Sequence, residues 1–234
     1  MIEKIVGGLK IAEREIVYVT MRDGSLVPAA VIWPLDMDRS GKTKYPVKVY
    51  IYGGPDHQMV YDRYAAPYFG TQWWANHGVV QVVLDTRSAG HLGKAGVNTI
   101  YRSLGVHELE DFIDGIKYFR ALPYIDSHKV GIEGYSFGGT MALLAATEGN
   151  EYFQYAVASS GVTDWTLYDN VHFQNSLQLI DKLQSQGKDF EFMAYPSGMH
   201  GYRGYQDRHF EMQNMRFWYK YLLGQDQPDV LKKK

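Results

Sequence analysis

The amino-acid sequence predicts an α/β fold in which a mostly parallel central sheet is covered by helices on both faces. Two observations lead to this prediction. Short apolar runs rich in Val and Tyr recur along the 234 residues, and in the later part of the chain helical patterns separate them. Strands that alternate with helices of this length form right-handed β-α-β crossovers, which build parallel sheets. We expect a single domain over residues 1–234, because α/β domains commonly exceed 200 residues.

Seven runs are predicted to be strands, since most are short, rich in β-branched or aromatic residues and bounded by turn-forming residues. They are Glu15–Thr20, Leu26–Trp33, Val47–Tyr52, Val79–Leu84, Val130–Glu133, Tyr155–Ala158 and Phe190–Tyr195. Asp23-Gly24 between the first two runs is a hairpin signal, so the sheet is expected to open antiparallel and to continue parallel. The predicted helices are His107–Leu122, Ser136–Thr147, Phe173–Gln186 and Tyr205–Leu223.

The composition excludes several functional classes. A formal net charge of −2 provides no field that would attract nucleic acid. No apolar run approaches 18 residues, so no membrane insertion is expected. The sequence has no cysteine, which excludes disulfides, thiolate metal sites and a cysteine nucleophile. His107-Glu108 lacks a second histidine four residues on, so no metal site is predicted, and no cofactor is expected.

The pentapeptide Gly134-Tyr135-Ser136-Phe137-Gly138 is a G-x-S-x-G motif. It follows the apolar run 130–132 and precedes the helical pattern 141–146, which is the strand, sharp turn and helix of a nucleophile elbow. The glycines leave room where strand and helix nearly touch, and the turn strains the serine backbone. A plain strand-to-helix turn is the alternative interpretation. In the elbow interpretation, the Ser136 hydroxyl stands above the sheet with a helix N-terminus behind it.

A serine nucleophile needs a base, and His200 is the best placed of the eight histidines. It lies in a Gly-, Pro- and Ser-containing loop directly after the last predicted strand, where an α/β-hydrolase presents its histidine. The oxyanion donors are expected from the backbone amide of Phe137 and from Tyr52-Gly53-Gly54, where the tyrosine offers a phenol. A solvated loop histidine and a simple strand-ending turn are the competing interpretations of these two segments.

Further short segments form an ordered set along the chain. They are Tyr52–Pro55 with Gln58, Asp85–Gly90, Leu104–Gly105 with Glu108–Asp111, Gly134–Gly139, Trp165 with Tyr168, Asn170–Gln174 and His200–Gly201. In this order they resemble the prolyl oligopeptidase family of serine peptidases, and most of all its dipeptidyl peptidase IV branch. The similarity covers nearly the whole chain from about Val17 onward. Its combined motifs are far more selective than the pentapeptide alone.

The resemblance implies an α/β-hydrolase fold and a role for each matching residue. Ser136 would be the nucleophile and His200 the base, and the Tyr52 hydroxyl with the Phe137 amide would form the oxyanion hole. A flat aromatic slot before the scissile bond would hold a proline or a similarly small residue, because a pyrrolidine ring packs well on aromatic faces. Asn170 would hydrogen-bond a substrate carbonyl. The residues expected to line the slot are Phe137, Val162, Trp165, Tyr168 and Val171.

Two departures from the family pattern affect this interpretation. Relatives carry a large β-propeller that grips the substrate's amino terminus, and no such domain lies within these 234 residues. The second departure lies near residues 168–170, where two family segments that relatives separate by helices, a loop and a core strand are joined directly. In relatives that strand ends in the triad aspartate, and the equivalent position here is Tyr168. Three explanations compete for this join: the sequence skips a segment, a segment was excised, or the natural protein has lost it. We favour a skipped or excised segment, and we expect that Asp169 is not the triad acid.

These features predict a serine peptidase that cleaves peptides after proline or alanine through an acyl-enzyme. A carboxylesterase of the same fold is one alternative, and a catalytically inert assembly module is another, because losing the triad acid lowers turnover by about 10⁴. Arg87 and the acidic residues Glu108, Glu110 and Asp111 are expected to form an internal ion-pair network of the scaffold. A homodimer is a candidate assembly. Family relatives are often periplasmic or extracellular, and the sequence itself predicts no compartment.

Overall fold

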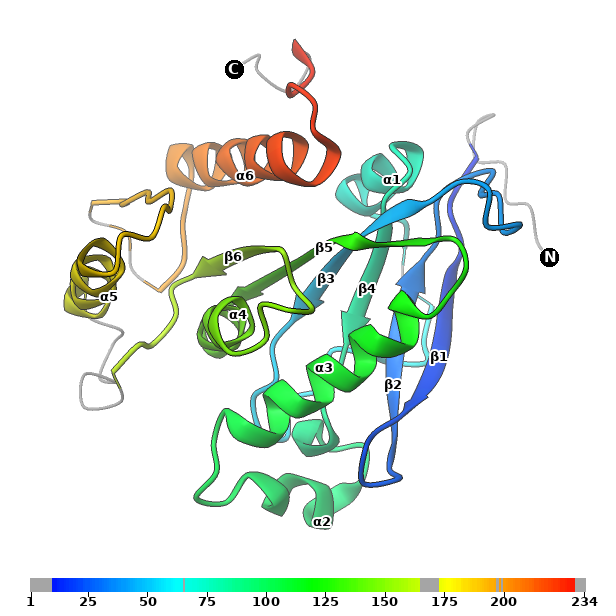
Figure 1. Cartoon of the computed structure of the whole chain (residues 1–234), viewed down its shortest axis with the longest axis horizontal. Helices are drawn as coiled ribbons and strands as arrows, with labels where there is room; N and C mark the ends of the chain where they lie inside the picture. Colours follow the sequence, from blue (N-terminus) through cyan, green and yellow to red (C-terminus); the bar gives the residue numbers. More distant parts are fainter. Residues whose placement is uncertain (1–9, 65, 165–172, 197, 199, 230–234) are drawn as a thin grey trace.

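The computed structural model describes residues 10–64, 66–164, 173–196, 198 and 200–229. Within these ranges the strands form one sheet in the order β1-β2-β4-β3-β5-β6 (Figure 1). The strands are β1 (Arg14–Thr20), β2 (Leu26–Ile32), β3 (Tyr45–Ile51), β4 (Val80–Leu84), β5 (Ile125–Tyr135) and β6 (Tyr155–Ser159). β2 pairs antiparallel with β1 and β4, and all later pairs are parallel. This confirms a sheet that opens antiparallel and continues parallel.

The helices cover both faces of the sheet, as the sequence predicts. They are α1 (Phe69–Asn76), α2 (Gly93–Val97), α3 (Val106–Arg120), α4 (Phe137–Thr147), α5 (Phe173–Ser185) and α6 (Tyr205–Trp218), with a π-helical turn, η4 (Tyr219–Leu223), after α6. Short 3₁₀ turns lie at η1 (Arg87–Ala89) and η2 (Asn98–Ile100). The sequence did not predict α1 and α2, which have eight and five residues and too few turns to show a helical period.

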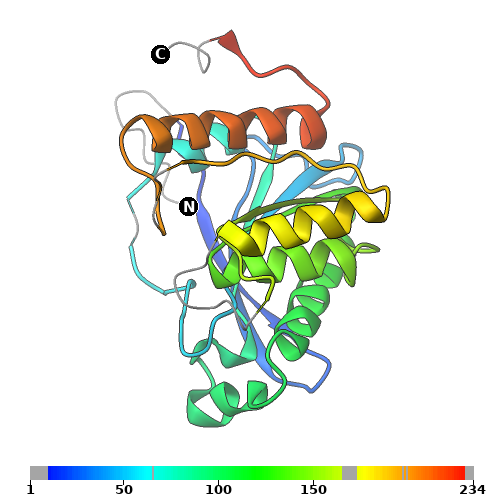
Figure 2. The same cartoon turned by 90° about the vertical axis from the view of Figure 1, so that its left-hand side faces the viewer.

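Two apolar clusters divide between the faces of the sheet. The larger one joins the strands to α3 and α4 through buried residues such as Phe112, Phe119 and Met141. The smaller one lies under α1, α6 and η4 and contains Trp74 and Trp218. Figure 2, turned toward the β6 side, shows α6 above the sheet and α5 near the viewer. α6 therefore approaches the sheet from the face opposite α3 and α4.

The sheet ends at β6, which has β5 as its neighbour and no second partner strand in the described ranges. The expected seventh strand, Phe190–Tyr195, is wrong, because these residues adopt no regular structure. An extended segment becomes a strand only when a neighbour accepts its backbone hydrogen bonds. Residues 190–195 are instead held by hydrogen bonds to side chains of the helical segment that follows. Glu191 accepts from Lys220 and Tyr221, and Tyr195 is hydrogen-bonded to His209. No helix in the described ranges is long and apolar enough to cross a bilayer.

Candidate active site

Ser136 occupies the sharp turn between β5 and α4. The strand ends at Tyr135 and the helix begins at Phe137, so a single residue connects the two elements. The backbone of Ser136 has φ 59° and ψ −123°, a conformation that residues other than glycine rarely adopt. Strain of this kind costs about 1 to 3 kcal/mol and persists only where the surrounding structure enforces it. The turn therefore has the geometry of a nucleophile elbow.

The glycines around Ser136 make that geometry possible. A Cβ atom on Gly134 would lie 2.0 Å from the carbonyl oxygen of Gly138, and a Cβ atom on Gly138 would lie 2.4 Å from the carbonyl oxygen of Ile51. The backbone amide of Ser136 donates to the carbonyl oxygen of Ser159 in β6 at 2.9 Å. The backbones of β5, α4 and the neighbouring strands β3 and β6 are therefore in close contact around Ser136, and these contacts hold its backbone in place. We call residues 134–138 the elbow.

His200 reaches the serine from the other end of the chain. Its Nε2 lies 2.9 Å from the Oγ of Ser136, although 64 positions separate the two residues. This is hydrogen-bond distance, and Nε2 can accept the hydroxyl proton when the imidazole carries its own proton on Nδ1. The His200 side chain is exposed, and its ring centroid lies 5.5 Å from that of Tyr135. The structure thus brings together the residues that the sequence singled out as nucleophile and base.

Tyr52 lies beside the elbow. It directly follows Ile51, the last residue of β3, and its ring centroid is 6.1 Å from that of Phe137. The next residue, Gly53, has φ 79°, so the chain turns away immediately after the tyrosine in a conformation that favours glycine. His57 packs its ring 4.4 Å from Tyr52 on the far side of this turn. Both predicted oxyanion donors therefore come from the carboxyl edge of neighbouring parallel strands, where α/β proteins place their sites.

The predicted substrate slot lies partly in the described structure. Val162 is 4% exposed, and Thr140 of α4 fixes it by donating to its carbonyl oxygen at 2.9 Å and accepting from its amide at 2.8 Å. This places the start of the segment next to the helix that carries the elbow. Four of the predicted site residues, together with Asp169, lie outside the described residues, and their roles stay predictions. The four are Trp165, Tyr168, Asn170 and Val171.

No carboxylate pairs with His200 among the residues that the structure describes. The histidine–carboxylate pairs found there lie elsewhere, with His91 2.7 Å from Asp85 and His107 2.9 Å from Glu110. The described part of the chain also contains no group of three or more histidine or acidic side chains that could hold a metal ion. In these ranges the site is therefore a serine–histidine dyad.

The expected scaffold network forms between the loop after β4 and helix α3. Arg87 donates from Nε to Asp111 at 2.8 Å and lies 4.0 Å from Glu110. Burial raises the pKa of Asp111, while its hydrogen bonds from Arg87 act in the opposite direction. Glu108 has a different role from the expected ion pair, because its carboxylate accepts from the backbone amide of Gly105 at 2.9 Å and so caps α3.

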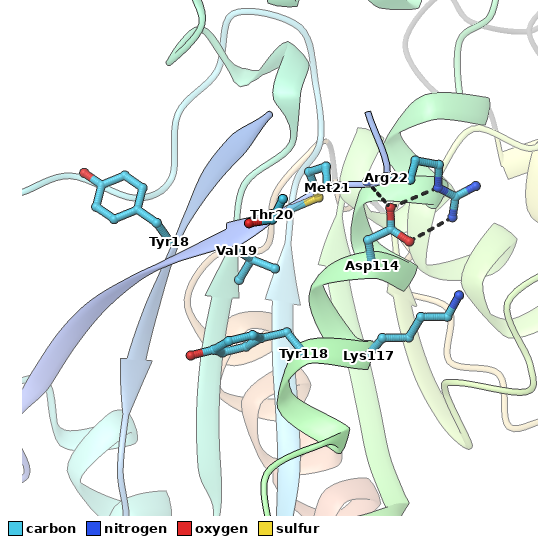
Figure 3. A pocket seen from close by; sticks show the side chains of 8 residues that line it. All are labelled: Tyr18, Val19, Thr20, Met21, Arg22, Asp114, Lys117 and Tyr118. Atoms are coloured by element: carbon cyan, nitrogen blue, oxygen red, sulfur yellow. Dashed lines mark hydrogen bonds and ion pairs between the residues drawn. The ribbon is translucent and has the colours of Figure 1, made fainter. Parts of the chain in front are cut away.

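Two shallow hollows open on the described surface. The first, of about 440 Å³, lies between β1 and α3, where Arg22 pairs with Asp114 at 2.9 Å (Figure 3). None of its lining residues belongs to the predicted site, and a surface ion pair is a common structural feature. The second, of about 460 Å³, is lined by Thr163, Asp164 and residues of α5. Two of its lining residues, Thr163 and Asp164, directly follow Val162 in the sequence.

Sequence reasoning missed one residue that contacts the dyad and one in the strand that leads to it. Tyr135 packs its ring against His200, and Glu133 is buried in the strand that ends in the elbow. A signal for Glu133 was present, because a carboxylate directly follows the apolar run 130–132, three residues before Ser136. Buried carboxylates need partners, so a charge in this position predicts a specific contact.

Comparison with known proteins agrees with the resemblance of the motifs. The model of the prolyl oligopeptidase family matches residues 66–170 and 169–226. The chain is 31% identical over 203 residues to "probable dipeptidyl-aminopeptidase B" of Talaromyces marneffei, covering 67% of this chain and 22% of the relative. It is 28% identical over 228 residues to prolyl endopeptidase FAP of Mus musculus, covering 77% of this chain and 30% of the relative. The chain thus spans less than a third of the length of these curated relatives.

The alignments also contain positions that this chain lacks. For the Talaromyces marneffei relative, 67% of 234 residues is about 157 residues, so about 46 of the 203 aligned positions have no residue here. For the Mus musculus relative, 77% is about 180 residues, which leaves about 48 of 228 positions. The two segments matched by the family model meet at residues 169–170, where the sequence joins two family motifs directly.

Among solved structures, the crystal structure of Porphyromonas gingivalis dipeptidyl peptidase 4 superposes with a TM-score of 0.84. It is 25% identical, and the match covers 92% of this chain and 36% of that one. The fold similarity therefore extends over nearly all of the present chain, and the family model alone accounts for more than half of it. The chain belongs to the prolyl oligopeptidase family and has the α/β-hydrolase fold.

Proposed function

We propose that this chain is the catalytic domain of a serine peptidase that cleaves peptides after proline or alanine. The observation that carries the proposal is the 2.9 Å contact between His200 Nε2 and Ser136 Oγ, made at an elbow whose backbone is held in a strained conformation. Relatives named as dipeptidyl-aminopeptidase and prolyl endopeptidase support the substrate class. An inert strand-to-helix turn has no need of a histidine at hydrogen-bond distance from its serine.

The chemistry follows from the roles of the two side chains. Ser136 Oγ attacks the carbonyl carbon of the scissile bond while His200 Nε2 takes the hydroxyl proton. The imidazolium then gives that proton to the leaving amine, and an acyl-enzyme remains on the serine. A water molecule, deprotonated by His200, hydrolyses the ester and restores both residues. The Phe137 amide and the Tyr52 hydroxyl would donate to the oxyanion in both tetrahedral intermediates.

Substrate selection would fall to the aromatic slot formed by Phe137 and the segment that begins at Val162. Proline suits such a slot because its ring has a flat apolar face and its nitrogen carries no hydrogen that needs a partner. A slot of this kind discriminates by about 1 to 3 kcal/mol against side chains of the wrong size, or roughly 10- to 200-fold. Alanine would bind more weakly than proline because it fills less of the slot.

A catalytically impaired domain is the second candidate function. It is favoured by the described part of the chain, where no carboxylate pairs with His200, and by the roughly 46 aligned positions of the Talaromyces marneffei relative that have no counterpart here. An acid on Nδ1 holds the imidazole in the productive tautomer, and losing it lowers turnover by about 10⁴ while leaving residual catalysis. The two candidates therefore differ in rate rather than in architecture.

The test combines covalent labelling with a substrate panel. A fluorophosphonate probe should label Ser136, and Ser136→Ala should abolish the label. Chromogenic dipeptide substrates with proline before the scissile bond should be hydrolysed faster than matched substrates with leucine or lysine, with alanine between them. Turnover of short acyl esters without any turnover of proline peptides would favour a carboxylesterase. A folded protein that neither binds the probe nor hydrolyses any of these substrates would contradict the proposal and leave the impaired domain.

A further inference from the structure

Glu133 is a buried carboxylate in β5, three residues before Ser136. Glu133 is only 8% exposed. A carboxylate buried to this extent is strongly destabilising unless both of its oxygens have hydrogen-bond or ion-pair partners. Both do. Oε1 accepts from Asn214 Nδ2, and Oε2 accepts from Lys48 Nζ at 2.6 Å and from Trp218 Nε1 at 3.2 Å. Glu133 is therefore a fully bonded polar centre inside the apolar layer.

The partners of Glu133 come from two other elements. Lys48 belongs to β3, and both Asn214 and Trp218 belong to α6. The ammonium group of Lys48 also lies 5.2 Å from the ring centroid of Trp218, within the range of a cation–π contact. Two residues before Glu133, a Cβ on Gly131 would lie under 3.0 Å from the Trp218 ring. The face of β5 that precedes the elbow is thus shaped and charged to hold α6 in one position.

Two further ionisable side chains lie close to this centre. Glu211 of α6 and Tyr50 of β3 face it together with Lys48. Burial first, and the Glu133 carboxylate second, raise the pKa of both Glu211 and Tyr50. Removing the charge from Glu133 therefore changes the electrostatics of the whole contact between α6 and the sheet, and leaves the ammonium of Lys48 without its opposite charge.

Helix α6 in turn contacts the segments on both sides of the base. It begins at Tyr205, five residues after His200, and the intervening Tyr202 packs its ring 4.9 Å from that of Phe210 on the helix. Tyr195, on the other side of the base, is hydrogen-bonded to His209 of the same helix at 3.0 Å. Both flanks of the exposed His200 are therefore attached to α6, while Ser136 is attached to β5.

We propose that Glu133 is a positioning residue that holds α6, and with it His200, at the correct distance from Ser136. The inference rests on the proposed function, because it assigns His200 as the base. It explains how the imidazole keeps its place in a site whose described residues provide no carboxylate for the ring. The contact acts between the strand that presents the nucleophile and the helix that follows the base.

The experiment compares Glu133→Gln with Glu191→Gln. Glutamine preserves the shape and one acceptor at position 133 but removes the charge that pairs with Lys48. The control, Glu191→Gln, removes an exposed carboxylate that forms an ion pair with Lys220 in the segment after α6. The rate constant for fluorophosphonate labelling is expected to fall about tenfold to a hundredfold in Glu133→Gln, because a small displacement of a catalytic group has an effect of this size. The control should label at the wild-type rate.

A double-mutant cycle separates positioning from a general structural role. If Glu133 acts through His200, Glu133→Gln should cause no further loss of labelling rate in a His200→Ala background. Equal slowing in both backgrounds, or an unchanged rate in Glu133→Gln alone, would overturn the proposal. If Glu133→Gln does not fold, Asn214→Ala removes one donor only and should give a smaller loss with the same dependence on His200.

Crystal structures of wild type and Glu133→Gln test the positioning without relying on activity. The distance from His200 Nε2 to Ser136 Oγ should increase from hydrogen-bond distance to beyond about 3.5 Å in the variant. An unchanged distance would overturn the proposal even if labelling were slowed. A wild-type protein that is never labelled would contradict the proposed function, and the two structures would still decide whether Glu133 positions the histidine.

Discussion

The elbow and the segment that carries His200 hold their residues in different ways. In the elbow, Ser136 is enclosed by backbone atoms of β3, β5, α4 and β6, and replacing its glycines would place side chains on top of main-chain oxygens. His200 lies in residues 196–204, which we call the base loop, and its described contacts are with the Ser136 hydroxyl and the Tyr135 ring. The nucleophile is therefore fixed by the sheet, whereas the base is fixed by the attachment of its flanks to α6.

This difference locates where the site can be weakened without unfolding the domain. Backbone packing is intolerant of change, because protein interiors are densely packed and a carbonyl oxygen cannot rotate away. Side-chain contacts on a helix can be altered one at a time, so α6 and the base loop can shift while the elbow stays intact. Stability measurements should therefore report on the elbow, and reaction rates should report on the base loop.

The largest effect is expected from adding a methyl group inside the elbow. Gly138→Ala would push its Cβ against the carbonyl oxygen of Ile51, and should lower the free energy of unfolding by about 3 kcal/mol or more. The matched control is Gly187→Ala, where nothing lies within 4 Å but φ is +63°, so a loss of about 1 to 2 kcal/mol is expected. Urea unfolding measures both. Equal losses would mean that the elbow is no more tightly packed than a surface turn.

The next effect concerns the base. His200→Ala should lower the rate of fluorophosphonate labelling about a hundredfold and leave the melting temperature unchanged, because the side chain is exposed. In a complete serine protease triad the same removal lowers turnover by about 2 × 10⁶, and removing the acid alone by about 3 × 10⁴, and these losses are not additive. If no carboxylate outside the described residues acts on His200, the acid's share is already lost, and on the order of a hundredfold remains for the histidine.

The size of this loss is therefore diagnostic. A loss near 10⁶ would show that a carboxylate acts on His200 after all, which would point to Asp169 or another residue outside the described ranges. A loss below about threefold would show that the histidine does not act as a base. His128→Gln serves as a control, since this histidine is exposed in the first half of β5, eight residues before Ser136 in the sequence.

Strain at the nucleophile gives a smaller and very specific effect. Ser136→Gly should be more stable than Ser136→Ala by about 1 to 2 kcal/mol, because glycine adopts φ 59° without the penalty that any other residue has. Both variants lack the hydroxyl, so the comparison isolates the backbone. Urea denaturation of the two proteins gives the difference directly. If alanine were as stable as glycine, the serine backbone would not be strained in solution.

The sequence predicted the elbow well because its signals are local. A G-x-S-x-G motif between a strand and a helix predicts one backbone geometry for five consecutive residues. The positions of its glycines predict where two backbones come into close contact. The parallel part of the sheet was predictable for the same reason, since each strand–helix alternation is readable within about 30 residues. The predicted identity of the base also depended on order along the chain, with His200 following the last β-rich segment.

The base loop region was less predictable because its structure depends on distant partners. Phe190–Tyr195 has the composition of a strand, but composition cannot tell whether a neighbouring strand is available, and here β6 does not pair with it. The role of α6 depends on Glu133, Asn214 and Lys48, which come from three separate parts of the chain. Such contacts leave no periodic pattern. The buried charge at Glu133 was the single visible sign.

The smallest effect tests whether the scaffold behind the elbow can be changed without affecting the chemistry. Glu108 is buried at the start of α3, and burial raises the pKa of its carboxyl group above the ordinary value, with Asp111 acting in the same direction. Its Oε2 caps Gly105, while Oε1 has no hydrogen-bond partner among the described residues. Because the folded state favours the neutral carboxyl group, the stability that Glu108 contributes is complete below about pH 4.5 and is lost as the pH rises through the raised pKa.

Glu108→Gln removes this titration and keeps an oxygen that can accept from Gly105. The free energy of unfolding of the variant should equal that of wild type at pH 4. At pH 7 it should be higher by about 0.5 to 1 kcal/mol, which is the size of the contribution of one ordinary hydrogen bond. Thermal unfolding across this pH range measures the difference, and the fluorophosphonate labelling rate should stay at the wild-type value throughout. If the variant's stability relative to wild type were higher at pH 4 than at pH 7, folding would lower the pKa of Glu108 instead of raising it. A changed labelling rate would show that the elbow responds to its scaffold as readily as the base loop responds to α6, and the distinction between the two regions would fail.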